Sequence, residues 1–178
     1  MEENTRYTPP DFMIETVTDE EGIRATVHTM LPSVRYRLNL VFGILLLVIS
    51  PPLFTIQEYL LGICAIITAV CCLIFYRQLP QVAAERQIAR LRESYGTTAV
   101  PCQMVFWPQG VVVNNRLSGG SVMMRYEIIR AITRCGDYLT FRTQENQSVI
   151  LRLQDAADQP DFLPYFLDKC PNAKKKNL

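Results

Sequence analysis

Residues 48–62 read VISPPLFTIQEYLLG, and this stretch decides how the rest of the chain is arranged. Paired prolines and the carboxylate of Glu58 interrupt a region from Arg37 to Arg77 in which no other side chain is charged. The apolar runs on its two sides, 38–56 and 59–76, each approach the ~20 residues that span a hydrocarbon core of ~30 Å. One helix over both runs would be about 58 Å long, about twice that thickness. The sequence therefore predicts two membrane-spanning helices joined by a turn.

The paired prolines predict where the first helix ends. A proline removes a backbone donor, and the residue before it is pushed out of the helical region. We therefore expect a helix from Val34 to about Ser50, with Ser50 capping the second helix and Pro51 at its first position. The alternative is a helical hairpin buried in a soluble core. The second run is apolar on every face, which favours the membrane because a soluble helix would carry a polar stripe.

Basic residues predict the orientation of this hairpin. Arginines precede the first apolar run and follow the second, whereas the connecting loop 50–58 has none. The positive-inside rule then predicts a two-pass protein with both termini in the cytoplasm and the connecting loop outside. Six side chains at the predicted interfaces would anchor the helices: Arg35, Tyr36, Arg37, Tyr59, Tyr76 and Arg77.

Composition narrows the class of protein further. A net charge of +1, from 18 basic and 17 acidic residues, gives no reason to expect a nucleic-acid partner. The six cysteines have no repeated spacing, and the polar start MEENTRYTPPD predicts no signal peptide. We therefore expect reduced thiols in a cytosolic setting. Cys64 and Cys71, seven residues apart on one helix face, could pack or cross-link in a dimer.

The segment after the second span, 78–96, is predicted to form a juxtamembrane helix. Ala84, Ile88, Leu91 and Tyr95 share one face of it. This face could lie on anionic lipid or pack on the protein's own cytosolic domain. The tail, in turn, could be a solvated, frayed end or a contact for lipid head groups. The basic side chains available to head groups in these two segments are Arg86, Arg90, Arg92, Lys174, Lys175 and Lys176.

From residue 98 the pattern changes to short β-like runs. Turn residues separate six predicted strands, at 98–106, 110–115, 121–126, 128–134, 138–143 and 148–153. The fifth, YLTFRT, alternates as a half-buried antiparallel strand does. A final helix is predicted within 158–170, with Phe162, Tyr165 and Phe166 as core contacts. Together these elements predict a small sheet or barrel capped by the C-terminal helix.

The start of the chain predicts further strands. Residues 11–31 read as a β-hairpin, with strands FMIETVT and IRATVHTML around a turn at residues 19–22. We expect this hairpin to pair with the cytosolic sheet, which requires both to lie on one side of the membrane.

The motifs FWPQG (106–110), YEIIRAI (126–132) and DYLTF (137–141), after a double span and before a late helix, resemble the YcxB-like bacterial membrane family. The resemblance covers roughly Arg35 to Cys170 and implies a membrane-tethered cytosolic domain of the pleckstrin-homology-like (PH-like) type. It brings no catalytic residues. The expected organisation is an N-terminal hairpin (1–33), a transmembrane hairpin (34–77), a juxtamembrane helix (78–96), a PH-like domain (97–171) and a basic tail (172–178). The expected fold class is thus an α+β membrane protein, and the expected compartment is the plasma (inner) membrane.

Residues that would carry chemistry are sparse. His28 is the single histidine, and no serine or cysteine motif accompanies it. Neither span contains a buried charge of the kind that ion-coupled transporters use. We therefore predict no catalytic, cofactor-binding or metal-binding residues, and no small-molecule substrate. The expected function is a non-catalytic, membrane-anchored binding or assembly module whose partners are membrane lipid and a protein or a second copy. The alternative is an accessory subunit that a larger membrane complex recognises through the transmembrane helices.

Overall fold

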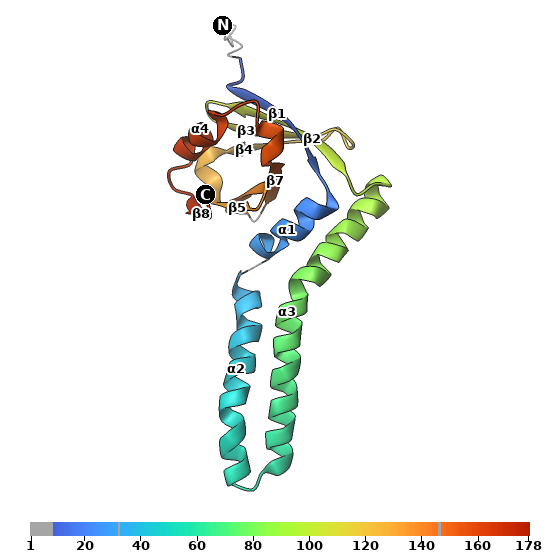
Figure 1. Cartoon of the computed structure of the whole chain (residues 1–178), viewed down its shortest axis with the longest axis vertical. Helices are drawn as coiled ribbons and strands as arrows, with labels where there is room; N and C mark the ends of the chain where they lie inside the picture. Colours follow the sequence, from blue (N-terminus) through green and yellow to red (C-terminus); the bar gives the residue numbers. More distant parts are fainter. Residues whose placement is uncertain (1–8, 32, 146) are drawn as a thin grey trace, which may run out of the picture. The chain divides into compact units, whose positions relative to one another are not determined.

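The computed structural model describes residues 9–31, 33–145 and 147–178, and for residues 33–36 it describes the backbone alone. The chain forms two compact units: unit 1 combines Met1–Met30 with Gln87–Leu178, and unit 2 is Leu31–Arg86. The fold is α+β, with four α-helices and two four-stranded sheets in the part described. Unit 2 is helical, and the strands described all belong to unit 1 (Figure 1).

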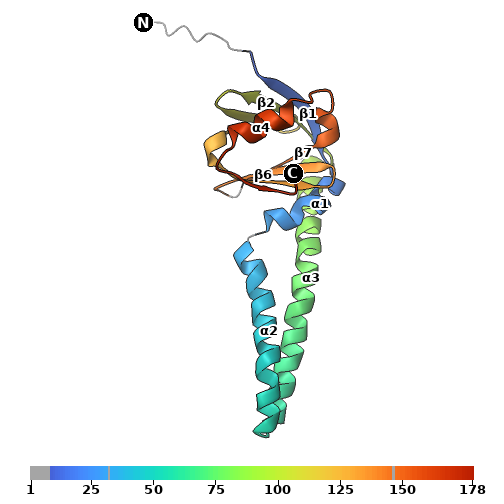
Figure 2. The same ribbon diagram turned by 60° about the vertical axis from the view of Figure 1, so that its left-hand side comes forward.

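Unit 2 consists of α2 (Ser33–Thr55) and the first part of α3 (Tyr59–Tyr95), which lie side by side (Figure 1 and Figure 2). They approach closely at Gly43, where an added Cβ would lie 3.3 Å from the Cβ of Cys72 and 3.4 Å from the carbonyl oxygen of Ala69. Both helices are long and apolar enough to cross a membrane. Only 11% of each apolar window is buried, whereas a core helix of a soluble protein is mostly buried. Length, composition and exposure all suit a membrane environment.

The turn between these helices lies later in the chain than expected. α2 continues through prolines 51 and 52, so the prediction that it ends near Ser50 was wrong. The hydroxyl of Ser50 does not cap α3 but donates to the carbonyl oxygen of Leu47 at 2.9 Å. That oxygen is the acceptor that Pro51 would use if it had an amide hydrogen, so the serine compensates for the proline. The chain reverses around Gln57, which has a φ of 63°.

α3 runs without a break from Tyr59 to Tyr95, so the segment 78–96 is not the separate helix that was predicted. Pro80 lies inside it and removes one donor, but residues 81–92 consist mostly of strong helix formers such as alanine, glutamine, glutamate and arginine. α3 ends at the expected stop, where the amide of Gly96 donates to the carbonyl oxygen of Arg92 at 2.9 Å and Gly96 has a φ of 70°.

Unit 1 contains two sheets. The first has the order β1-β2-β3-β4 and the second the order β7-β6-β5-β8. The strand bounds are β1 Phe12–Thr18, β2 Val100–Trp107, β3 Gly110–Asn115, β4 Ser121–Arg125, β5 Ile129–Cys135, β6 Tyr138–Thr143, β7 Ser148–Arg152 and β8 Lys174–Lys176. Short 3₁₀ turns follow β4 (η1, Tyr126–Ile128) and β7 (η2, Leu153–Ala156). All six strands predicted between residues 98 and 153 are therefore present, as β2 to β7.

The N-terminal strand joins the first sheet, as expected. β1 pairs antiparallel with β2 along its whole length, from Phe12 opposite Phe106 to Thr18 opposite Val100. The second half of the expected hairpin was wrong, because residues 20–30 form the helix α1 (Glu20–Met30).

Local chemistry explains why α1 is a helix. The carboxylate of Asp19 accepts a hydrogen bond from the amide of Gly22 at 2.8 Å, which caps the helix N-terminus. Glu20 and Glu21 place negative charge in the first turn, where the helix dipole favours it. The β-branched residues of this segment favour a strand by propensity alone, but the buried side chains include Ile23 and others at helical spacing.

The two sheets face each other across one core, which α4 (Phe162–Lys169) closes. The ring of Phe166 on α4 lies 5.7 Å from that of Phe106 in the first sheet and 5.2 Å from that of Phe141 in the second. Phe162 and Phe166 are fully buried, as predicted. The described strands form two separate sheets and do not close into a barrel.

β6 is buried on both faces and is not the half-buried strand that its alternation predicts. Leu139 and Phe141 belong to the core between the sheets. Tyr138 and Thr140 point the other way and are buried as well. α1 covers this second face, and the hydroxyl of its Thr29 lies 3.4 Å from that of Thr140.

Candidate functional site

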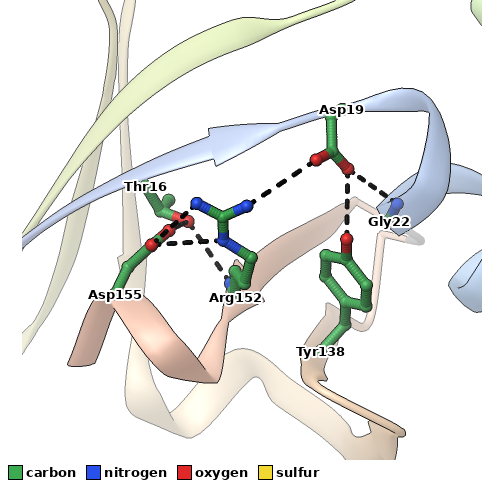
Figure 3. Close-up of polar contacts among 6 residues, drawn as sticks. All are labelled: Thr16, Asp19, Gly22, Tyr138, Arg152 and Asp155. Carbon is green, nitrogen blue, oxygen red and sulfur yellow. Dashed lines mark hydrogen bonds and ion pairs between the residues drawn. The ribbon is translucent and has the colours of Figure 1, made fainter. Parts of the chain in front are cut away.

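A polar network joins the N-terminal segment of unit 1 to its second sheet (Figure 3). We call it the clasp, and it consists of Thr16, Asp19, Gly22, Tyr138, Arg152 and Asp155. β1 and the start of α1 supply the first three residues, and β6, β7 and η2 supply the others.

The first half of the clasp centres on Asp155. Arg152 donates to Oδ1 of Asp155 from Nε at 3.2 Å and from Nη2 at 3.1 Å. Oδ2 of Asp155 accepts the hydroxyl hydrogen of Thr16 at 2.7 Å. The Thr16 oxygen in turn accepts from the backbone amide of Arg152 at 3.3 Å. Hydrogen bonds among Thr16, Arg152 and Asp155 thus join β1 to the end of β7.

The second half centres on Asp19. Its Oδ1 accepts from the amide of Gly22 and, at 3.3 Å, from the hydroxyl of Tyr138. Its Oδ2 lies 3.9 Å from Nη1 of Arg152, so this arginine bridges the two carboxylates. Asp19 therefore caps α1 and, at the same time, fixes the helix to β6.

The electrostatics of the clasp suit a structural role. The hydrogen bond with Asp155 and the charge of that carboxylate raise the pKa of Arg152. Burial, followed by the charge of Asp19, raises the pKa of Tyr138. The arginine stays cationic and the tyrosine stays protonated near neutral pH, so neither exchanges a proton there. The clasp can hold two segments of the chain together.

A shallow hollow of about 630 Å³ lies elsewhere on unit 1, and it is lined by Ala25, His28, Arg134, Cys135, Gly136, Asp137 and Asn177. It brings Sγ of Cys135 to 3.9 Å from Nε2 of His28. No local sequence pattern indicated this neighbour of His28, because the two residues are 107 positions apart. Burial raises the pKa of Cys135, so its thiol is neutral rather than an activated nucleophile.

The predicted membrane anchors lie on α2 and α3. Arg37, Tyr59 and Arg77 are exposed, and Tyr76 is half-buried. The side chains of Arg35 and Tyr36 lie outside the described ones.

The residues predicted to contact head groups are not all free to do so. On α3, Ala84 and Ile88 are buried, which agrees with a helix packed on protein rather than on lipid. Arg86 and Arg90 are exposed. Nη2 of Arg92 forms an ion pair with Glu20 of α1 at 3.2 Å, so this arginine ties two helices of unit 1 together.

The basic tail is not a frayed end. Residues 174–176 form β8, which pairs in parallel with β5 so that Lys174 lies opposite Ala131 and Lys176 opposite Thr133. Lys174, Lys175 and Lys176 are all exposed, so a row of cations borders the second sheet.

Sequence reasoning missed most of the clasp. The pattern Asp-Glu-Glu-Gly at 19–22 is a helix start and could have revealed α1. The roles of Thr16, Arg152 and Asp155 had no local signal, because each depends on a partner that the fold supplies.

Comparisons with protein-family models, curated proteins and solved structures give no match for this chain.

Proposed function

We propose that this chain is a membrane-anchored, non-catalytic binding or assembly module. In this proposal α2 and α3 cross the plasma (inner) membrane, and unit 1 lies in the cytoplasm together with both termini.

The pairing of β1 with β2 is the observation that carries the proposed topology. These strands flank the apolar hairpin in the sequence, yet Phe12 lies opposite Phe106 in one ladder. Paired strands must lie on the same side of a membrane. The chain between them therefore crosses an even number of times, and α2 and α3 supply two crossings. The arginines outside the hairpin then favour the cytoplasm for unit 1.

The architecture of unit 1 supports the module. Two mainly antiparallel sheets packed face to face and closed by a C-terminal helix agree with the PH-like domain that the YcxB-like resemblance implies. Because a fold does not specify a function, the role rests on the unit's surfaces. The clasp and the aromatic core hold unit 1 together as a scaffold that can present those surfaces to a partner.

The accessory-subunit alternative needs the membrane helices to offer close-packing surfaces to another protein. The two glycines of the hairpin, which would allow such packing, are engaged within it. Gly43 faces Ala69 and Cys72, and an added Cβ at Gly62 would lie 2.8 Å from the ring of Phe54. This use of the glycines favours unit 1 as the recognition element.

A labelling experiment tests the topology. Gln57→Cys, at the turn between the helices, should react with a membrane-impermeant maleimide in intact cells. Asp158→Cys, at an exposed position of unit 1, should react only after the cells are opened. Peptide mass spectrometry then assigns the label to each site. Labelling of both sites in intact cells, or recovery of the full chain in the soluble fraction, contradicts the proposal.

A chimera separates the module from the accessory subunit. The hairpin is replaced by an unrelated two-span hairpin, and proteins that co-purify in mild detergent are compared with those of the wild type. The module predicts that the partner is retained, because unit 1 is unchanged. Loss of the partner with unit 1 still folded supports the subunit.

A further inference from the structure

The four edges of the two sheets are protected unequally. β1 and β7 meet each other, since the amide of Arg152 donates to the hydroxyl of Thr16. β8 consists of three exposed lysines, and charged residues on an edge strand discourage pairing with another chain. β4 reads SVMMR, is charged only at Arg125, and has Met123 52% exposed and Val122 46% exposed. Among the described strands, β4 is the edge without such protection.

The backbone of β4 has hydrogen-bonding groups that face away from the sheet. A Cβ added to Gly110 on β3 would lie 2.4 Å from the carbonyl oxygen of Met124, so that carbonyl points towards β3. In an extended strand the polar groups of successive residues point to opposite sides. The amide and carbonyl of Met123 therefore point outward, as do those of Ser121 and the amide of Arg125. The backbone of an added strand could form hydrogen bonds with these groups.

An apolar row leads to this edge across the outer face of the first sheet. Met13 lies opposite Val105, Val105 opposite Val112, and Val112 opposite Met123. Their sequence neighbours, such as Ile14, belong to the core on the other face. The row ends at the exposed side chain of Met123, where a further strand would extend it.

The size and charge of the edge indicate what would occupy it. β4 has five residues, which is about 17 Å of strand. Such an edge covers far less than the ~1,200–2,000 Å² of a stable protein dimer, but it suits a short extended peptide. Arg125 shares the outer face with Met123, so a carboxylate opposite Arg125 and apolar residues opposite the rest of β4 would complement it.

We infer that β4 is a docking edge for an extended segment of a partner protein that pairs antiparallel with it. The segment places an acidic residue opposite Arg125 and apolar residues opposite residues 122–124. This inference deepens the proposed function and rests on it, because it names the kind of partner that unit 1 binds.

The direct test uses a fluorescent peptide, Glu-Val-Val-Val-Thr, which matches β4 read from Arg125 back to Ser121. Fluorescence anisotropy measures its binding to the full-length chain in detergent. We expect saturable binding, and about two- to five-fold weaker binding of the Lys-Val-Val-Val-Thr peptide, since an exposed ion pair contributes little. Arg125→Glu should reverse this preference. Absence of saturable binding to the wild type overturns the inference.

Substitutions of Met123, with Met13 as the control position, decide whether the peptide binds at the edge of β4. Met123→Pro removes the outward amide and should weaken binding about ten-fold or more. If this variant does not fold, Met123→Glu keeps the backbone and should weaken binding by repelling the peptide carboxylate. Met13→Glu is the matched control, because Met13 is 47% exposed at the opposite end of the same row. It should bind as the wild type does.

Two further results would overturn the inference. One is a loss of affinity in Met13→Glu equal to that in Met123→Glu. The other is a wild-type dimer, seen by light scattering, that Met123→Pro converts to a monomer, because the occupant of the edge is then a second copy. Neither result affects the labelling and chimera experiments, so the proposed function is judged separately.

Discussion

Oγ1 of Thr16 donates a hydrogen bond to Oδ2 of Asp155 at 2.7 Å, although 139 positions separate the two residues. The whole apolar hairpin lies between them in the sequence. Unit 1 is therefore assembled from chain on both sides of the hairpin. A fragment that starts at residue 98 would lack β1 and α1, and with them the fully buried Ile14 and Ile23. Experiments on unit 1 thus need the full chain or both of its segments.

Removing the carboxylate of the clasp should destabilise unit 1. Asp155→Ala leaves the hydroxyl of Thr16 and the guanidinium of Arg152 without their shared acceptor. We expect a loss of about 1–3 kcal/mol, measured by thermal unfolding of the full chain in detergent. Asp158→Ala, at an exposed neighbouring position, should change stability by less than about 0.5 kcal/mol. Equal effects of the two substitutions would contradict the clasp.

The register of β1 and β2 can be captured as a disulfide. Glu15 lies opposite Gln103, on the outer face of the sheet. The pair Glu15→Cys and Gln103→Cys should cross-link on mild oxidation, because directly opposed residues in an antiparallel ladder lie within disulfide reach. Asn114 lies opposite Gln103 on the next strand. Glu15→Cys with Asn114→Cys should not cross-link, since two strand spacings, about 9.6 Å, exceed that reach. Mass spectrometry of digested protein reads out both pairs.

Gly110 should not tolerate a side chain. An added Cβ would lie 2.4 Å from the carbonyl oxygen of Met124, which is backbone and cannot move aside. Gly110→Ala should therefore destabilise unit 1 by about 1–3 kcal/mol in the same unfolding assay. At Gly120 the nearest atom is the flexible Oγ of Ser118, at 3.2 Å. Gly120→Ala is the control and should cost clearly less; a reversed order would show that β3 and β4 are not this close.

Stability of unit 1 should fall at alkaline pH. Burial raises the pKa of Cys170 from 9.0 to about 12. Above the unfolded pKa the unfolded thiol loses its proton while the folded thiol keeps it, so the folded state binds more protons and its stability decreases with pH. This contribution is complete below pH 9 and is lost as pH rises towards about 12. Cys170→Ala should flatten that part of a plot of stability against pH. An unchanged slope would contradict the shift.

The helices and strands that depend on patterns among neighbouring residues were predicted well. The near absence of charge between Arg37 and Arg77 indicated two apolar helices, and the turn residues after residue 98 located six strands. The C-terminal helix predicted within 158–170 is present as α4. Two local errors remain instructive. The helix continued past prolines 51 and 52 because Ser50 compensates for a missing donor, and the cap at Asp19 outweighed the strand propensity of α1.

The sequence by itself determined the apolar hairpin, the strand positions and the closing helix, since side-chain period, length and turn chemistry are properties of adjacent residues. Only the tertiary structure decided that α1 buries the second face of β6, that Asp155 binds Thr16, that Cys135 lies beside His28, and that β4 remains an open edge. Each of these features requires segments from both sides of the hairpin, or from separate strands, to meet. No local pattern encodes such a meeting, because it depends on how the whole core packs.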